Sequence, residues 1–384
     1  MNKLYKIVVV GLVTVFSVCV FAGWFRDDRP RTIKVRCPYR SLQRAINHAT
    51  EGERIRVVGR CDEAVEITTD DLTIVGPATI NAEGTGAPAI LIDGAHRVKI
   101  EHLTVKNGNG GLRAERGASV VLNHIMALNN SGSVAPGGNG VTITDNSTAE
   151  IYGMTASKNT RSGFVCSRSS SCRFVDTKSE MSDNGRDGLS CILASHCDVD
   201  GADLDLMSNK RNGLNVSTVV NFAVTNSFVH AEKNVQSLSL SSKANLLITA
   251  GTEIASNNNT RGKRVVSSGS VVNISDTKTT LNNNSTAGLE LRVGTYQSVG
   301  VQFEATGNGK DITAEKLSFL RLGDNGEPDA PVQVGTAEVR FGAVASFEMA
   351  NNEASSLETL TCLDRDELFL QVLGVQPTAI GCGE

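Results

Sequence analysis

One asparagine recurs along the middle of this 384-residue chain at a strict interval of twenty-five residues. The recurring positions are Asn159, Asn184, Asn209, Asn234, Asn259 and Asn284. A glycine follows four positions later in four of these units, at Gly163, Gly188, Gly213 and Gly288. Where the glycine is missing, we expect Leu238 and Lys263 to hold its place. A fixed period without insertions predicts identical structural units stacked along one axis.

Each unit also has the composition of short β-strands. The units are rich in Ser, Thr, Asn and Val, and apolar residues alternate, as in Leu214 and Val216 and again in Phe222 and Val224. Twenty-five residues are enough for three short strands and three turns, which is one coil of a parallel β-helix. We expect the asparagine to lie in a tight turn, with a left-handed φ, and to bond the asparagine of the next coil.

The N-terminal segment is typical of an export signal. Lys3 and Lys6 precede an apolar run over residues 7–21, and small residues allow cleavage before Gly23. Residues 1–22 are therefore predicted to be a signal peptide, and an uncleaved anchor over residues 7–25 is the alternative. We expect a secreted or periplasmic protein with no membrane contact after cleavage.

Eight cysteines remain after that signal, an even number that favours disulfides in an exported chain. Two Cys-x5-Cys pairs lie one period apart, so their four side chains occupy two equivalent interior columns. We expect pairing within a coil, because neighbouring coils hold Cβ atoms about 4.8 Å apart, longer than a relaxed disulfide prefers. The expected bridges are Cys166–Cys172, Cys191–Cys197, Cys37–Cys61 and Cys362–Cys382.

The composition restricts the class of partner. The formal net charge is −4, which argues against a general nucleic-acid binder. Aromatic residues make up 4% of the chain and the single tryptophan, Trp24, lies beside the cleavage site. Proteins that bind neutral glycans usually stack sugar rings on such side chains, so a neutral glycan is disfavoured.

The chain reads as one domain with a cap at each end. Residues 41–50 form a short amphipathic pattern that predicts a capping helix within residues 23–62. The β-helix is expected over residues 63–335, and residues 336–384 are expected to form the last coils and a C-terminal cap. Caps are needed because the end coils of a solenoid expose unpaired strand edges.

These residues resemble the pectin-lyase-like right-handed parallel β-helix superfamily. The opening SLQRAINHA, RIRVVGR, EAVEIT and DLTIVGP is similar to that of many exported members, and the Asn-x-x-x-Gly-Leu-x-Val units are similar to its repeat. The resemblance implies an all-β, right-handed parallel β-helix. It says little about function, because this fold carries lyases, hydrolases, epimerases, esterases, tailspikes and adhesins.

The resemblance also implies where catalytic residues would lie. Polygalacturonase-like hydrolases carry Asn-Thr-Asp, Gly-Asp-Asp and Gly-His-Gly motifs, whose acidic and His residues align just before the glycine of each unit. In this chain we align Asn139, Ser162, Asp187, Asn212, Ser237 and Gly262 at that position. Only Asp187 is acidic, whereas glycoside hydrolysis normally uses two carboxylates, so a hydrolase is disfavoured. The Asp-Pro-His-Asp of alginate epimerases and the Gln-Asp-Thr-Leu of pectin methylesterases are absent as well.

One position earlier, arginine recurs from unit to unit. The column is expected to contain Arg161, Arg186, Arg211 and Arg261, with Gln236 in the gap. The family comparison puts this column on the face where related enzymes hold sugar chains. Arginine forms bidentate pairs with carboxylates, so the row could bind a uronic-acid polymer, with Arg161, Arg261 and Asn212 as binding residues. A solvated row of turn residues is the alternative, because repulsion in water is only about 1 kcal/mol per pair.

A lyase would need a group that neutralises the uronate carboxylate and a base that removes the C5 proton. Arg186 or Arg211 could neutralise the carboxylate, and Asp187 or Lys210 could act as the base. No cofactor and no metal are expected. Calcium would be the candidate cation, but the acidic run of Asp198, Asp200, Asp203 and Asp205 spreads along a strand rather than forming a cage.

A second polar column contains Glu180, Asp205 and His230, one unit apart. It would suit an acid, a base and a histidine, but a polar ladder on the surface is the more ordinary interpretation. Three functions therefore stay open. The chain is a lyase or epimerase acting on an acidic extracellular polysaccharide, a non-catalytic matrix or surface protein that binds such a polymer, or a structural adhesion module.

Overall fold

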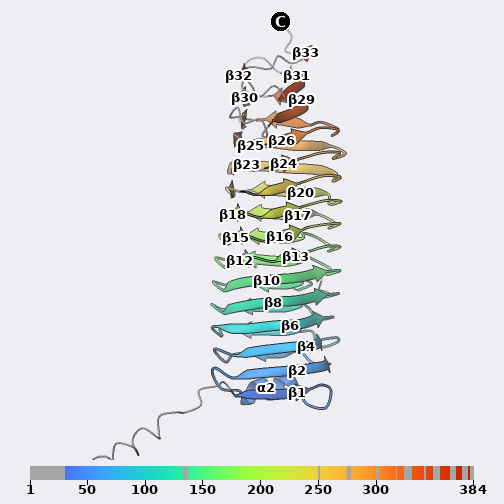
Figure 1. Cartoon of the computed structure of the whole chain (residues 1–384), viewed down its shortest axis with the longest axis vertical. Coiled ribbons are helices and arrows are strands. Elements are labelled where there is room, and N and C mark those ends of the chain that lie inside the picture. Colours follow the sequence, from blue (N-terminus) through green and yellow to red (C-terminus); the bar gives the residue numbers. More distant parts are fainter. Residues whose placement is uncertain are drawn as a thin grey trace, which may run out of the picture.

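The computed structural model describes most of the chain after residue 30. The described residues are 31–132, 137–249, 251–274, 278–299, 302–316, 318–323, 331–340, 343–348, 355–363, 369–373 and 379–380. The predicted signal peptide at residues 1–22 lies outside them. Figure 1 shows a straight rod of stacked coils, with the helix α2(Leu42–His48) at one end and β33 at the other. About twelve coils follow one another, each of about 25 residues, as the period predicts.

The strands of successive coils form three faces of the rod. The first face, which follows the recurring glycine, contains β3(Val65–Ile67), β5(Ile90–Asp93), β7(Leu112–Glu115), β9(Val141–Ile143), β11(Phe164–Ser167), β14(Leu189–Ile192), β17(Asn212–Ser217), β20(Gln236–Ser241), β27(Ile312–Glu315) and β33(Ala379–Ile380). The second face contains β1(Thr32–Arg36), β12(Ser171–Val175), β15(His196–Asp200), β18(Asn221–Thr225), β21(Asn245–Thr249), β28(Phe319–Gly323), β30(Val344–Glu348) and β32(Phe369–Leu373). The third face contains β13(Lys178–Glu180), β16(Asp203–Asp205), β19(Phe228–His230), β22(Glu253–Ala255), β24(Lys278–Thr280) and β26(Gln302–Ala305).

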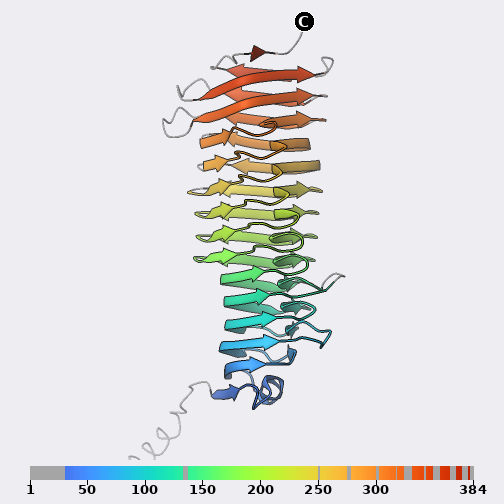
Figure 2. The ribbon, with the colours of Figure 1, turned by 90° about the vertical axis from the view of Figure 1, so that its right-hand side faces the viewer.

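Longer strands continue around a corner from one face to the next, which Figure 2 shows from the side. Those that bend from the second to the third face are β2(Arg54–Cys61), β4(Thr73–Asn81), β6(Val98–Lys106), β8(Ser119–Leu128) and β10(Thr148–Ser157). Nearer the C-terminus, β23(Arg261–Ile274) and β25(Ala287–Val299) join the first to the second face, and β29(Val332–Arg340) and β31(Ser356–Leu363) join the third to the first. Neighbouring coils pair in parallel on every face, as between β11 and β14, β12 and β15, and β13 and β16.

The N-terminal end is closed by the predicted helix. α2(Leu42–His48) starts after the N-cap Ser41 and buries Leu42 and Ile46 against the first coils. The carboxylate of Glu63 accepts the backbone N–H of Leu42 at 2.6 Å, which suits the positive end of a helix. Within the described part of the chain, no helix is long and apolar enough to cross a membrane.

Three of the four expected disulfides are confirmed. Cys166–Cys172 and Cys191–Cys197 each close within one coil, with Cα atoms 6.4 and 6.5 Å apart. In the next coil, Val216 and Phe222 occupy the same two interior columns, as expected. Cys37–Cys61 ties the N-terminal cap to the second coil. The expected Cys362–Cys382 bridge includes Cys382, which lies outside the described residues.

The recurring asparagines form a buried ladder along the rod. Asn184 Nδ2 donates to Asn209 Oδ1 at 3.1 Å and to the Ala156 carbonyl at 2.9 Å, and each neighbour repeats the pattern. The expected left-handed φ of the asparagine is wrong, because it belongs to the preceding residue, as in Asp183 (φ 57°) and Ser208 (φ 56°). That residue turns the chain and points its own side chain outward, so the asparagine that follows can point inward.

The turn between Asn234 and the strand that follows it is one residue shorter than the corresponding turn after Asn209. The ladder keeps its interval of twenty-five, but Leu214 pairs with Leu238, only twenty-four residues later, and Leu238 pairs with Lys263. Ser237 and Gly262 therefore hold the glycine column, and the expectation that Leu238 and Lys263 do so is wrong. Those two side chains instead continue the buried apolar column of the first face.

Candidate functional site

Three arginines line the turn that enters the first face, in front of β11, β14 and β17. The backbone N–H of Arg186 donates to the carbonyl of Arg161 at 3.0 Å, and that of Arg211 donates to the carbonyl of Arg186 at 2.9 Å. This direct stacking confirms a row of three guanidinium-bearing residues on consecutive coils. We call Arg161, Arg186 and Arg211 the arginine row.

Arg261 does not belong to the arginine row, and the expectation that it does is wrong. It pairs with Gln236 on one side and Ala287 on the other, in the column of Asn212. The turns after Asn234 and Asn259 are each one residue shorter than the others, so the residues of β20 and of the start of β23 lie one position forward relative to the ladder. Arg261 Nε instead lies 3.8 Å from the carboxylate of Glu290.

A depression of 350 Å³ opens beside this row. Arg161, Arg186 and Asp187 line it together with Ser190 and Asn215 of the next strands. Among the described residues, neither Arg161 nor Arg186 has a carboxylate partner within ion-pair distance. Partial burial and the neighbouring charge of Arg186 lower the pKa of Arg161, with Asp187 opposing the shift. The guanidinium groups of Arg161 and Arg186 therefore face this depression without an ion-pair partner among the described residues, although Glu115, Asp145 and Asp187 also line it.

Asp187 is the only carboxylate between Asn139 and Arg261 in the row that precedes the glycine column, and it is 2% exposed. Burial raises its pKa, and the nearby Arg211, the amide of Asn212 and Arg186 oppose part of that shift. Its Oδ1 accepts a hydrogen bond from Asn212 Nδ2 at 2.7 Å and lies 4.0 Å from Arg211 Nε. A carboxylate with a raised pKa beside cations can take up and release a proton near neutral pH more readily than an ordinary one.

Of the other predicted residues, Asn212 belongs to this site and Lys210 is exposed to solvent. Asn212 is buried, fixes Asp187, and leaves its Oδ1 without a hydrogen-bond partner among the described residues. Lys210 is exposed in the turn and does not line the depression. The structure therefore brings together Arg161, Arg186 and Asp187, places Arg211 and Asn212 at their edge, and leaves Lys210 outside.

The alignment of the position before the glycine also changes after Asn212. Gln236 and Arg261 hold this position, where Ser237 and Gly262 had been expected. The correction leaves Asp187 as the only acidic residue of that column between Asn139 and Arg261. This column therefore still lacks the second carboxylate that a glycoside hydrolase normally uses.

Two further basic residues of the depression were missed in the sequence. Arg113 and Arg168 both line it, and each pairs with a carboxylate, Arg113 with Glu115 at 2.8 Å and Arg168 with Asp145 at 3.2 Å. Arg113 comes from an earlier coil, and only the pairing of β7 with β9 and of β9 with β11 shows that this coil adjoins the site. Arg168 follows β11 inside the strict array, but the next coil has Leu193 at this place, so no repeat marks it.

The second polar column is confirmed as a column, since Glu180 pairs with Asp205 and Asp205 with His230. Asp205 is bound by Lys178 at 2.6 Å, and His230 Nε2 lies 2.9 Å from Glu232. The acidic run is engaged as well, with Asp200 paired to Arg173 and Asp198 to His196. These contacts are those of a surface ladder of ion pairs.

Two clusters among the described residues have three groups close enough to hold a metal ion. Both are built around cysteines, Cys166, Cys191 and Cys197 in one and Cys37, Cys61 and Glu63 in the other. All of these cysteines are in disulfides, so none offers a thiolate.

Comparison with known proteins supports the fold. Residues 63–201 match the family description "right handed beta helix region". The chain is a right-handed parallel β-helix. The resemblance seen in the sequence is thereby confirmed for the fold. Among curated proteins, no sequence matches the chain.

Several solved structures share the architecture at low identity. A single-substitution mutant of the periplasmic alginate epimerase AlgG has 13% identity and a TM-score of 0.51, covering 90% of this chain and 83% of its own. A double mutant of that epimerase has 15% identity and a TM-score of 0.47 over the same shares. A mannuronic acid specific polysaccharide family 6 lyase from human gut microbiota has 7% identity and a TM-score of 0.47, covering 87% of each chain. At these identities the likeness concerns the fold.

Proposed function

We propose that this protein acts on an acidic, uronate-containing polysaccharide held along the arginine row. The observation that carries the proposal is the pair of Arg161 and Arg186, which line a depression without a carboxylate partner among the described residues. A carboxylate on each sugar unit would supply the missing counter-charges. Coils about 4.8 Å apart repeat their side chains at a spacing that suits a polymer with a charge on every unit.

The chemistry that suits Asp187 is β-elimination. Arg186 would neutralise the uronate carboxylate, and the ionised Asp187 would take the C5 proton. The C4–C5 double bond forms as the C4–oxygen bond breaks, and the proton on Asp187 passes to the leaving oxygen. No outside reactant is required. The raised pKa of Asp187 favours this role, because it makes the carboxylate a stronger base.

The location that suits this function is outside the cytoplasm, either secreted or periplasmic. Three disulfides among the described residues support it, since disulfides persist in oxidising compartments. Structures of similar fold include a periplasmic alginate epimerase. A secreted or periplasmic protein would meet acidic polysaccharides directly.

Incubating the chain from Gly23 to Glu384 with a panel of acidic polysaccharides, with and without calcium, tests the proposal. Ultraviolet absorbance of unsaturated uronates and product size would be followed together. Rising absorbance with shortening chains would establish the lyase. Retained, salt-sensitive binding with a flat trace would leave a matrix-binding protein, and the absence of both would leave a structural module.

A further inference from the structure

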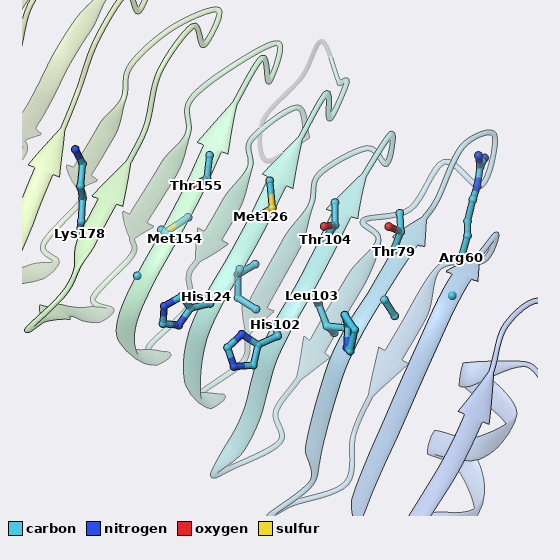
Figure 3. A pocket seen from close by; sticks show the side chains of 15 residues that line it. Arg60, Thr79, His102, Leu103, Thr104, His124, Met126, Met154, Thr155 and Lys178 are labelled. Carbon is cyan, nitrogen blue, oxygen red and sulfur yellow. The ribbon is translucent and has the colours of Figure 1, made fainter.

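A second hollow lies at the corner between the second and third faces, away from the arginine row. It has a volume of 740 Å³ and crosses the strands β2, β4, β6, β8 and β10. Figure 3 shows His102 and His124 side by side on one flank and Thr79, Thr104, Met126 and Thr155 along the other. We call this hollow the histidine groove. Its volume is that of a typical ligand site, about 300–1,000 Å³.

One flank of the groove repeats from coil to coil. Thr79 pairs with Thr104, Thr104 with Met126, and Met126 with Thr155. Arg60 precedes Thr79 in the same row. Five strands at this spacing span about 19 Å, so the row suits an extended ligand lying along the rod. The hydroxyl groups of the three threonines donate to and accept from no other described residue, which leaves them free to bond a ligand.

The two histidines occupy a strained backbone position. His102 has a φ of 52° and His124 a φ of 51°. In the coils that follow, the same bend is formed by residues that tolerate positive φ more readily, namely Gly153, Asp176, Gly201, Asn226 and Gly251. A left-handed φ costs a residue with a Cβ roughly 1–2 kcal/mol. Histidines therefore stand on two consecutive coils at a bend that the later coils form with glycine, aspartate or asparagine.

Their arrangement suits a flat, polar ligand. The two imidazole rings stack with centroids 5.1 Å apart and an interplanar angle of 28°. A hydrogen bond of 2.5 Å between His124 Nδ1 and Asn123 Oδ1 fixes the orientation of that ring. Both side chains are exposed, and Met126 beside them is 43% exposed. Ring faces and a thioether give apolar contact to sugar rings, and ring nitrogens give hydrogen bonds.

The charges around the groove do not oppose an anionic ligand. No acidic side chain lines it, whereas Arg60 and Lys178 stand at its two ends. Each of these cations contacts a carboxylate outside the groove, Asp62 and Asp205 respectively. The row itself turns acidic only beyond Thr155, at Glu180. No carboxylate stands in this row from Arg60 to Thr155, the stretch that forms the hollow.

We propose that the histidine groove is a second binding track for the same acidic polysaccharide, a site that holds the polymer without acting on it. This inference rests on the proposed function for the class of ligand. The imidazole rings pack against sugar rings, the threonine hydroxyls bond sugar hydroxyls, and the terminal cations meet carboxylates. Two tracks on different sides of one rod would let it hold two chains, or two parts of one chain, at once.

Calorimetric titration with a short uronate oligosaccharide tests the proposal. The oligosaccharide is one from a polymer that binds the Gly23–Glu384 chain. We expect two binding sites per chain in the parent and one in the variant that combines His102→Asn with His124→Asn. Asparagine suits a positive φ, so this variant should melt at the same temperature or a higher one. Lys158→Asn, an exposed residue with a φ of 57°, is the matched control and should keep both sites.

The outcomes separate this inference from the proposed function. Two sites with unchanged affinity in the histidine variant would overturn the groove and leave the arginine row standing. A single parent site that is lost in the histidine variant but kept in Arg161→Gln/Arg186→Gln would support the groove and overturn the arginine row. Should the histidine variant fail to fold, Thr104→Val with Thr155→Val removes two free hydroxyls and should weaken the same site. No binding of any uronate oligosaccharide would overturn both.

Discussion

Arginines lie on the first face of the rod, or in the turn that enters it, in two regions. The two regions differ in whether a carboxylate pairs with the arginine. In the early coils, Arg161 and Arg186 face a depression without a counter-ion among the described residues. In the late coils, Arg292 Nε contacts Glu290 at 2.8 Å and Glu315 at 2.6 Å. Lys310 meets Glu338 at 2.5 Å, and Arg340 contacts the same carboxylate.

The late coils show how charged side chains are arranged when they stabilise only the fold. The late coils interleave glutamates with the cations, so the charges neutralise one another within the protein. The early coils also pair Arg113 and Arg168 with carboxylates, but their arginine row repeats the cation from coil to coil, which adds about 1 kcal/mol of repulsion per neighbouring pair even in water. Stability does not explain the early arrangement, whereas an external polyanion does. Four predictions test this contrast, from the largest expected effect to the smallest.

The largest effect is expected from Asp187→Asn. Removing the base should lower turnover of the polysaccharide by about 10²–10⁴-fold and leave its affinity nearly unchanged. In the parent, turnover should fall in acid at a pH above that of an ordinary carboxylate, because burial raises the pKa of Asp187. Initial rates of unsaturated-uronate formation against pH provide the measurement. Equal rates in both proteins would exclude Asp187 as the base.

Lys263→Leu tests the late coils through their core. Lys263 is 1% exposed in a column of leucines, with Tyr296 Oη at 3.4 Å and Thr279 Oγ1 at 3.5 Å. Burial lowers its pKa to about 7 from the ordinary 10.5. The substitution should stabilise the protein by roughly 2–4 kcal/mol, because it removes a charge that is buried without a counter-ion.

The sign of its pH dependence follows from that lowered pKa. Below about pH 7 the amine is protonated in both folded and unfolded chains, so the cost of burying the charge is fully present. Between about pH 7 and 10.5 only the unfolded chain binds the proton, so the stability of the parent rises with pH. The advantage of Lys263→Leu should therefore shrink as the pH rises. Urea unfolding at several pH values measures it, and a constant advantage would contradict the account.

Arg161→Gln combined with Arg186→Gln should weaken polysaccharide binding about ten-fold, or about 1.4 kcal/mol. The salt dependence of the affinity should become shallower, because two charges no longer contribute. Arg292→Gln in the late coils is the matched control, since this arginine is already neutralised. Equal losses in the two proteins would remove the distinction between the regions.

The smallest effect is expected when the late coils are made to resemble the early ones. Glu290→Gln with Glu315→Gln would leave Arg292 and Arg261 without their carboxylates. We expect a stability loss of about 1 kcal/mol, since the arginine side chains of these pairs are partly exposed although Glu290 is buried, and a weak new affinity for the polyanion. Affinity electrophoresis in a gel containing the polymer would detect it. A stability loss of several kcal/mol would mean that the network is essential to the fold.

Much of the site followed from the period. The stacking of Arg161, Arg186 and Arg211 was predictable, because residues at equal places in equal coils must lie above one another. The failure began at Val235, where one residue fewer separates the ladder from the strand. The constant asparagine interval conceals that change, since the residue lost before β20 is regained only after β21, between Thr249 and Glu253. Arg261 was therefore assigned to the wrong column.

The sequence alone determined the parallel β-helix, the coil length, the asparagine ladder and the disulfides within coils. Each depends on side chains that repeat at a fixed interval, and repetition is visible without coordinates. Only the tertiary structure decided that Lys263 is buried, that Asp187 is desolvated beside unpaired arginines, and that His102 and His124 meet at a bend. Those facts depend on which way a side chain points and on which coil lies beside it, and both are set by turn lengths and backbone angles that the sequence pattern does not specify.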